Sequence, residues 1–242
     1  MQPLQTVEQT ARSRTVSNLA SRDMLMGCRF YVLAAAKYLS TSDSPAVHQT
    51  RSRIVAVGLL TFSINVTLDG CVDHQEGIAD DETHAFFTRL MNERGAMLWG
   101  RVTYEMMESY WPAVARGEVV APPTIREWAV QLEAKPKYVV SSTRAGFPWT
   151  NSHHVAGDLR TSVQRLKDAT PTGVLLGSGK LATELDRLDL IDEYMFLVHP
   201  KIVGHGPTLY ESGLPKTRRL ELVSATPLHN GAIAMHYRRA RG

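Results

Sequence analysis

The sequence lacks a long run of apolar residues. No stretch approaches the roughly 18 uninterrupted apolar residues that a membrane-spanning helix requires, because Arg29 and Lys37 interrupt the most apolar segment near the N-terminus. We therefore expect no membrane span. With 242 residues, of which 43% are apolar, the chain is long enough for one sizeable core, and we expect one domain of up to about 200 residues with an appendage.

Cysteine is scarce as well. Cys28 and Cys71 are far apart, and neither has a Cys or His partner at zinc-ligand spacing, which argues against a disulfide framework and a structural zinc site. Five of the histidines also show no metal-ligand spacing on one element, namely His74, His153, His154, His199 and His205. We expect no metal site, and a reducing cytoplasm is the expected setting.

The folded part of the chain has no basic excess. The net charge is +3, but residues 1–53 hold seven Lys and Arg against three Asp and Glu, which leaves 20 against 21 for residues 54–242. A nucleic-acid-binding protein needs a basic face on its folded part. The local cluster that remains is Arg238, Arg239 and Arg241 near the C-terminus. We therefore expect no nucleic-acid partner.

The first 53 residues are rich in Ser, Thr and Arg and show no sustained periodicity outside residues 24–39. We interpret residues 1–53 as an N-terminal extension, disordered or loosely helical, that precedes a domain formed by residues 54–242. A targeting segment is an alternative, because the stretch is poor in acids and contains small residues at 34–36. Its long polar start argues against a signal peptide, and an upstream start codon is a further alternative.

From residue 54 onward, short apolar runs alternate with helical patterns. Buried strands are predicted at 54–64, 96–99, 138–141, 173–176 and 193–198. Helices are predicted at about 102–109, after the capping residues Asp80 and Asp158, after a capping box from Thr124 to Glu127, and after residue 179. This alternation predicts a three-layer α/β/α fold with a mostly parallel central sheet.

The C-terminal part has a different pattern. Segments 219–225 and 232–238 flank Asn230-Gly231, which is the strongest short-range signal for a β-hairpin. The sheet is therefore expected to end in an antiparallel edge hairpin.

Three predicted strand-to-helix junctions contain glycine, hydroxyl or basic residues, at 99–103, 140–143 and 176–181. In an open α/β sheet, ligands bind outside the carboxyl ends of the strands, where helix N-termini present free N–H groups and a partial positive charge. One such junction also occurs as an ordinary tight turn. Three in one chain predict a site for an extended phosphorylated ligand.

Two familiar phosphate motifs do not match. Gly177-x-Gly179-x-x-Ala182 has the spacing of the dinucleotide fingerprint, but it lies late in the fold, and Asp189 follows too soon to be the ribose-binding acid. Residues 173–180 resemble a nucleotide-triphosphate loop but have five residues between the glycines, and Leu181 stands where a magnesium-binding Ser or Thr belongs. Kinase and ATPase chemistry are therefore disfavoured.

An ordered set of short motifs resembles the dihydrofolate reductase-like fold and, within it, the reductase domain of riboflavin biosynthesis. In chain order the motifs are Thr67-Leu68-Asp69-Gly70, Gly100-Arg101-Val102-Thr103-Tyr104-Glu105, Tyr138-Val139-Val140-Ser141-Ser142-Thr143, Gly177-Ser178-Gly179-Lys180-Leu181, Leu190-Ile191-Asp192-Glu193, His199-Pro200 and Gly204-x-Gly206. The resemblance covers about residues 54–238. Each motif is common by itself, whereas the ordered set is specific.

The resemblance implies an NADPH-binding site. Its implied cofactor-binding residues are Gly100, Arg101, Thr103, Ser141, Ser142, Thr143, Gly177, Ser178, Gly179, Lys180 and Leu181. Arg101 would pair with the 2′-phosphate, because a guanidinium offers paired donors and a permanent charge. Thr103 would help to hold the pyrophosphate. The alternative for Arg101 is a surface ion pair with Glu105, four residues further on.

The predicted catalytic end differs from that of true dihydrofolate reductases. Counting back from Gly100, the position of their folate-binding carboxylate falls at His84, which argues against folate. His84 is the candidate proton donor beside the hydride acceptor, with an ordinary helix histidine as the alternative. Asp69 is the second catalytic candidate, with a turn-forming role as its alternative.

The sequence thus predicts an NADPH-dependent reductase that transfers a hydride to a small heterocyclic, carbonyl or imine acceptor. A pyrimidine of riboflavin biosynthesis is one candidate acceptor, although the zinc deaminase signature often fused to such enzymes is absent from the sequence. A non-catalytic nucleotide-binding module of the same fold is the alternative, and a structural subunit without NADPH affinity is a third. The resemblance also implies a homodimer.

Overall fold

The computed structural model describes residues 58–240. The predicted N-terminal extension lies outside these residues, as do Cys28 and the first residues of the predicted strand 54–64. Cys71 is buried and is a free cysteine.

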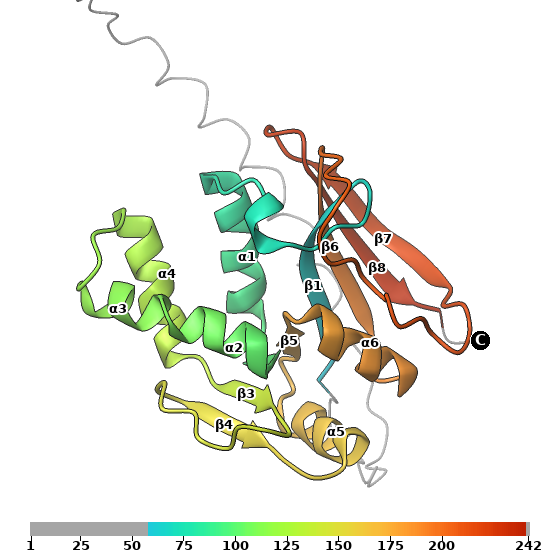
Figure 1. Cartoon of the computed structure of the whole chain (residues 1–242), viewed down its shortest axis with the longest axis horizontal. Coiled ribbons are helices and arrows are strands. Elements are labelled where there is room, and N and C mark those ends of the chain that lie inside the picture. The colour runs from blue at the N-terminus through green and yellow to red at the C-terminus, as the bar shows by residue number, and fades with distance from the viewer. Residues whose placement is uncertain (1–57, 241–242) are drawn as a thin grey trace, which may run out of the picture. The chain divides into compact units, whose positions relative to one another are not determined.

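One mixed eight-stranded sheet organises the described part of the chain (Figure 1). Its strands are β1 (Leu60–Thr67), β2 (Ala96–Gly100), β3 (Lys137–Val140), β4 (Ser152–Val155), β5 (Val174–Leu176), β6 (Glu193–His199), β7 (Leu220–Pro227) and β8 (Ile233–Arg239). The strand order is β4-β3-β2-β5-β1-β6-β8-β7, in which β1 to β6 are parallel and β8 and β7 continue antiparallel. The predicted fold class is confirmed.

Helices connect the parallel strands. They are η1 (His74–Glu76), α1 (Asp81–Glu93), α2 (Arg101–Glu108), α3 (Trp111–Arg116), α4 (Pro123–Ala134), α5 (Leu159–Ala169) and α6 (Gly179–Arg187). Asp80 caps α1 by accepting from the Thr83 amide, and Asp158 caps α5 by accepting from the Thr161 amide, both as predicted. Within residues 58–240, no helix is both long and apolar enough to cross a membrane.

Alternating side chains of the central strands enter two separate cores. On β2, Met97 and Trp99 pack with residues of α1 and α4, whereas Leu98 packs with residues of α5 and α6. On β5, Leu175 belongs to the first core, and its two neighbours belong to the second. Because successive strand residues point to opposite faces, α1 with α4 and α5 with α6 cover opposite faces of the sheet.

Two predicted element boundaries are wrong, namely the start of one helix and the end of the first strand. The predicted capping box at Thr124 does not form, because α4 begins at Pro123 without a side-chain cap, and proline suits the first helical position. The first strand begins at Leu60 and continues to Thr67, three residues beyond its predicted end. This extension occurs because β1 pairs with β6 as far as Thr67 opposite His199. The predictions also omitted β4 and α3.

The predicted C-terminal hairpin is confirmed. Strands β7 and β8 pair antiparallel, and the Leu228 amide donates to the Ala232 carbonyl across the turn. Gly231 has a φ of 84°, a conformation that favours glycine. The hairpin leaves β7 at the sheet edge.

Candidate active site

A groove of about 1460 Å³ opens at the carboxyl ends of the parallel strands. Its walls come from the middle of β1, the loop before α1, the ends of β2, β3 and β5, and helices α1 to α4 and α6. Nine of the predicted site residues line it: His84, Gly100, Arg101, Thr103, Gly177, Ser178, Gly179, Lys180 and Leu181. Ser141, Ser142, Thr143 and Asp69 are not among the lining residues.

The junctions after β2 and β5 are joined directly by Ser178. Its hydroxyl donates to Thr103 Oγ1 at 2.6 Å and accepts from the Gly100 amide at 3.0 Å. Strands β2 and β5 are neighbours in the sheet, so α2 and α6 begin side by side. Two of the three predicted phosphate-binding junctions therefore form one continuous wall.

Both helices at this wall leave their first N–H groups without a side-chain cap. Gly100 precedes α2 and Ser178 precedes α6, and neither N-cap side chain accepts a hydrogen bond from its own helix. By contrast, α1 and α5 are capped by aspartates, and α3 and α4 have proline in the first turn. Uncapped helix N-termini attract anions through their N–H groups and their dipole.

Arg101 lies at the start of α2 and takes part in an ion-pair chain. Its Nη1 donates to Glu105 Oε2 at 2.7 Å, and its side chain is 41% exposed. This is the surface ion pair that was predicted as the alternative role of Arg101. Arg144 approaches the other oxygen of Glu105 at 3.4 Å and binds Glu108 with two nitrogens, at 2.9 and 3.1 Å. Arg101 therefore lies at the first residue of α2, and Arg144 lies beside its C-terminal half.

The third predicted junction follows β3, the strand next to β2. Ser141 Oγ accepts from the amides of Thr143, at 3.2 Å, and Arg144, at 2.8 Å, so the hydroxyl closes a tight turn. Strand register places Val140 opposite Gly100, and Val140 lines the groove. The turn that contains Ser141 to Thr143 therefore lies next to the groove without forming its wall.

His84 lies on α1 and lines the groove. Its ring packs edge-on against Trp128, with the ring centroids 5.5 Å apart, and its buried Nε2 has no hydrogen-bond partner in the structure of residues 58–240. Burial lowers the pKa of His84, and Asp81 raises it by a smaller amount. The imidazole is therefore neutral at pH 7, so it has no extra proton to give and acts as a donor only through its N–H.

Asp69 holds a turn together. Its Oδ1 accepts from the Thr67 hydroxyl, and its Oδ2 accepts from the amides of Val203 and Gly204 at 3.0 and 2.7 Å. These hydrogen bonds, with that of Thr67 the largest, lower the pKa of Asp69. This geometry gives Asp69 a role in turn formation and places it outside the groove lining.

His199, at the end of β6, anchors the loop before α1. Its Nδ1 accepts from the Ile78 amide at 3.3 Å, which makes Nε2 the protonated nitrogen that donates to Asn65 Oδ1 at 2.9 Å. The side chain is fully buried, and burial is the main cause of a lowered pKa for His199. The His199-Pro200 motif therefore carries a neutral imidazole that fixes this loop.

The aromatic part of the groove was not predicted from the sequence. Trp111 of α3 packs edge-on against Trp128 of α4, with ring centroids 4.3 Å apart, and Trp128 contacts His84 of α1. Phe87 and Met107 line the same groove. We call this cluster of His84, Phe87, Met107, Trp111 and Trp128 the aromatic chamber. The sequence does show two tryptophans, Trp111 and Trp128, after Gly100. No regular spacing connects them, so their contact could not be predicted.

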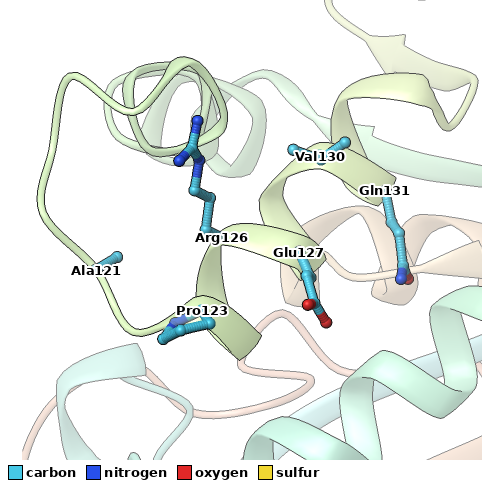
Figure 2. A pocket seen from close by; sticks show the side chains of 6 residues that line it. All are labelled: Ala121, Pro123, Arg126, Glu127, Val130 and Gln131. Atoms are coloured by element: carbon cyan, nitrogen blue, oxygen red, sulfur yellow. The ribbon is translucent and has the colours of Figure 1, made fainter.

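A second depression, of about 590 Å³, lies along α4 (Figure 2). It is lined by Ala121, Pro123, Arg126, Glu127, Val130 and Gln131 and contains no aromatic side chain. Val130 is 51% exposed. Within residues 58–240, no group of three or more His, Cys, Asp or Glu residues is arranged to hold a metal ion.

A mostly parallel sheet, with two helices that begin together without side-chain caps at one end of a large groove, defines an α/β protein with a ligand site at the carboxyl ends of its strands. Comparison with known families gives the assignment. The chain belongs to the family of the RibD C-terminal domain, whose model matches residues 59–234. The predicted family is confirmed.

Known proteins agree with this assignment. The chain is 25% identical over 182 residues to the uncharacterized protein YyaP of Bacillus subtilis. The matched region covers 74% of this chain and 93% of YyaP. A putative riboflavin biosynthesis protein from Shewanella is similar in structure, with a TM-score of 0.59 at 20% identity over 76% of this chain and 99% of that one. A dihydrofolate reductase from Enterococcus faecalis, solved with NADP(H), has a TM-score of 0.51 at 12% identity over 76% and 98%. These likenesses show a shared fold.

Proposed function

We propose that this protein is an NADPH-dependent reductase that transfers a hydride to a small heterocyclic, carbonyl or imine acceptor. Its family supports reductase chemistry. A structural relative from Thermotoga maritima is described as a deaminase and 5-amino-6-(5-phosphoribosylamino)uracil reductase, with a TM-score of 0.53 at 18% identity. The match covers 76% of this chain and 57% of that one.

The wall between α2 and α6 carries the proposal. Two helix N-termini without side-chain caps begin side by side, and Ser178 joins them through the Gly100 amide and the Thr103 hydroxyl. A pyrophosphate would accept hydrogen bonds from the first amides of these helices. The residues present therefore fit a dinucleotide with its pyrophosphate at this wall.

The adenosine end would lie toward Arg101 and the turn that contains Ser141, Ser142 and Thr143. Arg101 is partly exposed, and its guanidinium would bind a 2′-phosphate in competition with Glu105. Lys180, an exposed residue in the first turn of α6, would add a positive charge near the pyrophosphate. Gly177, Gly179 and Leu181 would supply backbone contacts.

When bound, the reduced nicotinamide would supply a hydride to a carbon of the acceptor, and a proton would reach the neighbouring heteroatom, so that NADP⁺ and the reduced acceptor are formed. This chain would orient the two rings against each other. His84 would contact the acceptor in its neutral form, and the proton would come from water through the open groove. Asp69 would act indirectly by fixing the turn after β1.

Replacing Arg101 tests the cofactor choice. We expect Arg101→Ala to weaken NADPH binding by about 10- to 100-fold, since a charge-assisted hydrogen bond contributes about 1.5–3 kcal/mol. NADH binding should change by less than about threefold. Titration calorimetry with both cofactors measures the difference, and Arg160→Ala, an exposed arginine on α5, is the matched control. Equal losses for NADPH and NADH would remove Arg101 from the 2′-phosphate.

A nucleotide-binding module without turnover is the second candidate. The residue His84, at the position that the sequence resemblance assigns to the carboxylate of true dihydrofolate reductases, favours this candidate. Loss of the reduced-nicotinamide absorbance with a panel of pterins, flavins and aminouracils separates the two candidates. Saturable NADPH binding without consumption on every acceptor would favour the module.

A homodimer and a cytoplasmic setting remain predictions. The edge strand β7 offers one candidate dimer surface, because Leu222 and Val223 are 59% and 47% exposed.

A further inference from the structure

The charged residues along the groove are distributed unevenly. Among the described residues that line it, the lysines and arginines are Arg101 and Lys180, and both stand at the start of the helices that Ser178 joins. The acids that line it are Asp73, Asp80, Asp81, Glu184 and Glu211. Positive charge is therefore confined to the wall proposed for the cofactor.

The N-terminus of α1 lies far from that wall. Asp80 Oδ2 accepts from Asn230 Nδ2 at 2.9 Å, which places the start of α1 at the β7–β8 turn. In the sheet order, β8 is four strand spacings from β2 and three from β5. At about 4.8 Å per spacing, the separation is roughly 14–19 Å. The acceptor end of the groove therefore has acids at its edge and no lysine or arginine on its walls.

The aromatic chamber continues from the start of α1, because His84 lies one helical turn after Asp80 and its ring contacts Trp128. Trp111, Trp128 and His84 pack edge to face, and Phe87 and Met107 add apolar surface. Aromatic and thioether side chains favour flat, polarisable ring systems. The buried ring nitrogens Nε2 of His84 and Nε1 of Trp128 both lack a hydrogen-bond partner in the described structure. A heterocycle whose edge carries polar atoms would provide partners for them after a small side-chain movement.

We infer that the acceptor of this reductase is a flat heteroaromatic compound, neutral or cationic, without a phosphate group. This inference rests on the proposed function and narrows its substrate class. It also separates this chain from the Thermotoga relative, whose described substrate carries a phosphoribosyl group. A phosphate at the acceptor end would face the carboxylates of Asp80 and Asp81 with no lysine or arginine beside it, and like charges in a groove raise the free energy of binding.

Matched pairs of compounds test the inference on the full-length protein. Riboflavin and FMN, guanosine and GMP, and uridine and UMP each differ by one phosphate. Their dissociation constants are measured by fluorescence quenching in the presence of saturating NADP⁺, which keeps the cofactor wall occupied. We expect the unphosphorylated member of at least one pair to bind about tenfold more tightly or better, because a phosphate near Asp80 and Asp81 meets their carboxylates and no lysine or arginine of the groove lining.

A variant locates the binding to the chamber. Trp111→Leu should weaken the preferred compound about tenfold or more and leave NADP⁺ affinity within about twofold, because aromatic stacking contributes about 1–3 kcal/mol per base. Val130→Leu, on the other depression of α4 (Figure 2), is the control and should change neither affinity.

The outcomes separate the inference from the proposed function. Equal or tighter binding of the phosphorylated compounds, no binding of any compound, or no effect of Trp111→Leu would overturn the inference while NADPH binding still supports the proposed function. Absence of NADPH binding would overturn both.

Discussion

The buried ion pair between Lys167 and Asp192 gives a quantitative test of the second core. Lys167 Nζ lies 2.6 Å from Asp192 Oδ2, and the two side chains are only 6% and 7% exposed. Asp192 also accepts from the Leu60 amide at 2.8 Å, and Lys167 donates to the Leu190 carbonyl at 3.1 Å. The pair thus ties α5 to the first strand and to the segment before β6.

Lys167→Met removes the cation that lies beside the buried carboxylate of Asp192. Breaking a buried pair in this way costs about 3–5 kcal/mol of unfolding free energy. Urea unfolding, followed by tryptophan fluorescence and by circular dichroism, measures the loss. With a slope of about 2 kcal/mol per molar urea, the midpoint should fall by about 2 M. Arg165→Met, an exposed residue on the same helix, should change the free energy by less than about 0.5 kcal/mol.

A double variant identifies the cause of the loss. Adding Asp192→Asn to Lys167→Met removes the buried charge and keeps an oxygen that can accept from the Leu60 amide. The double variant should therefore recover about 1 kcal/mol or more relative to Lys167→Met alone. The reasoning is refuted if Lys167→Met costs less than about 1 kcal/mol, or if the double variant is no more stable than the single one.

Two further predictions concern the groove. Acidification from pH 7.5 to 5.5 should lower the melting temperature. Burial lowers the pKa of His199 in the folded state, so the unfolded chain binds a proton at a higher pH than the folded chain does. The stability that His199 contributes is therefore complete above the unfolded pKa and is lost as the pH falls toward the folded pKa. In His199→Gln the melting temperature should depend less steeply on pH. An unchanged slope would contradict the assignment of this pH dependence to His199. Ser178→Ala should destabilise the protein by about 1–3 kcal/mol, because the Gly100 amide loses its acceptor, and should weaken NADPH binding. Calorimetry that finds both quantities unchanged would argue against the shared wall.

The parts of the site that follow local rules could be predicted from the sequence. Gly100 and Gly179 stand where a buried strand gives way to a helix, and strand ends of a parallel sheet meet at one edge, so their proximity follows from the topology. The direct bond between Ser178 and Thr103 joins residues 75 positions apart. It depends on β5 pairing with β2, which the order of elements along the chain does not specify.

The aromatic chamber could not be predicted for the same reason. Trp111 and Trp128 come from two helices between β2 and β3, and their meeting depends on how those helices fold back over α1. The contribution of Arg144 was also missed, since no local pattern links it to Glu105 and Glu108. The Leu190 to Glu193 motif turns out to contain structural contacts, because Asp192 and Glu193 bind partners within the cores and the sheet.

The connection from β2 to β3 contributes to both the wall at Ser178 and the aromatic chamber, through different helices. The wall at Ser178 stands where the neighbouring strands β2 and β5 end, and hydrogen bonds from Ser178 to Gly100 and Thr103 hold its two sides together. The chamber takes Met107, Trp111 and Trp128 from α2, α3 and α4, the helices of the connection between β2 and β3, and it takes His84 and Phe87 from α1. Under the proposed function, changes in α3 and α4 would alter the acceptor site and leave the proposed cofactor wall in place, which makes these two helices the natural segment to redesign for a new substrate.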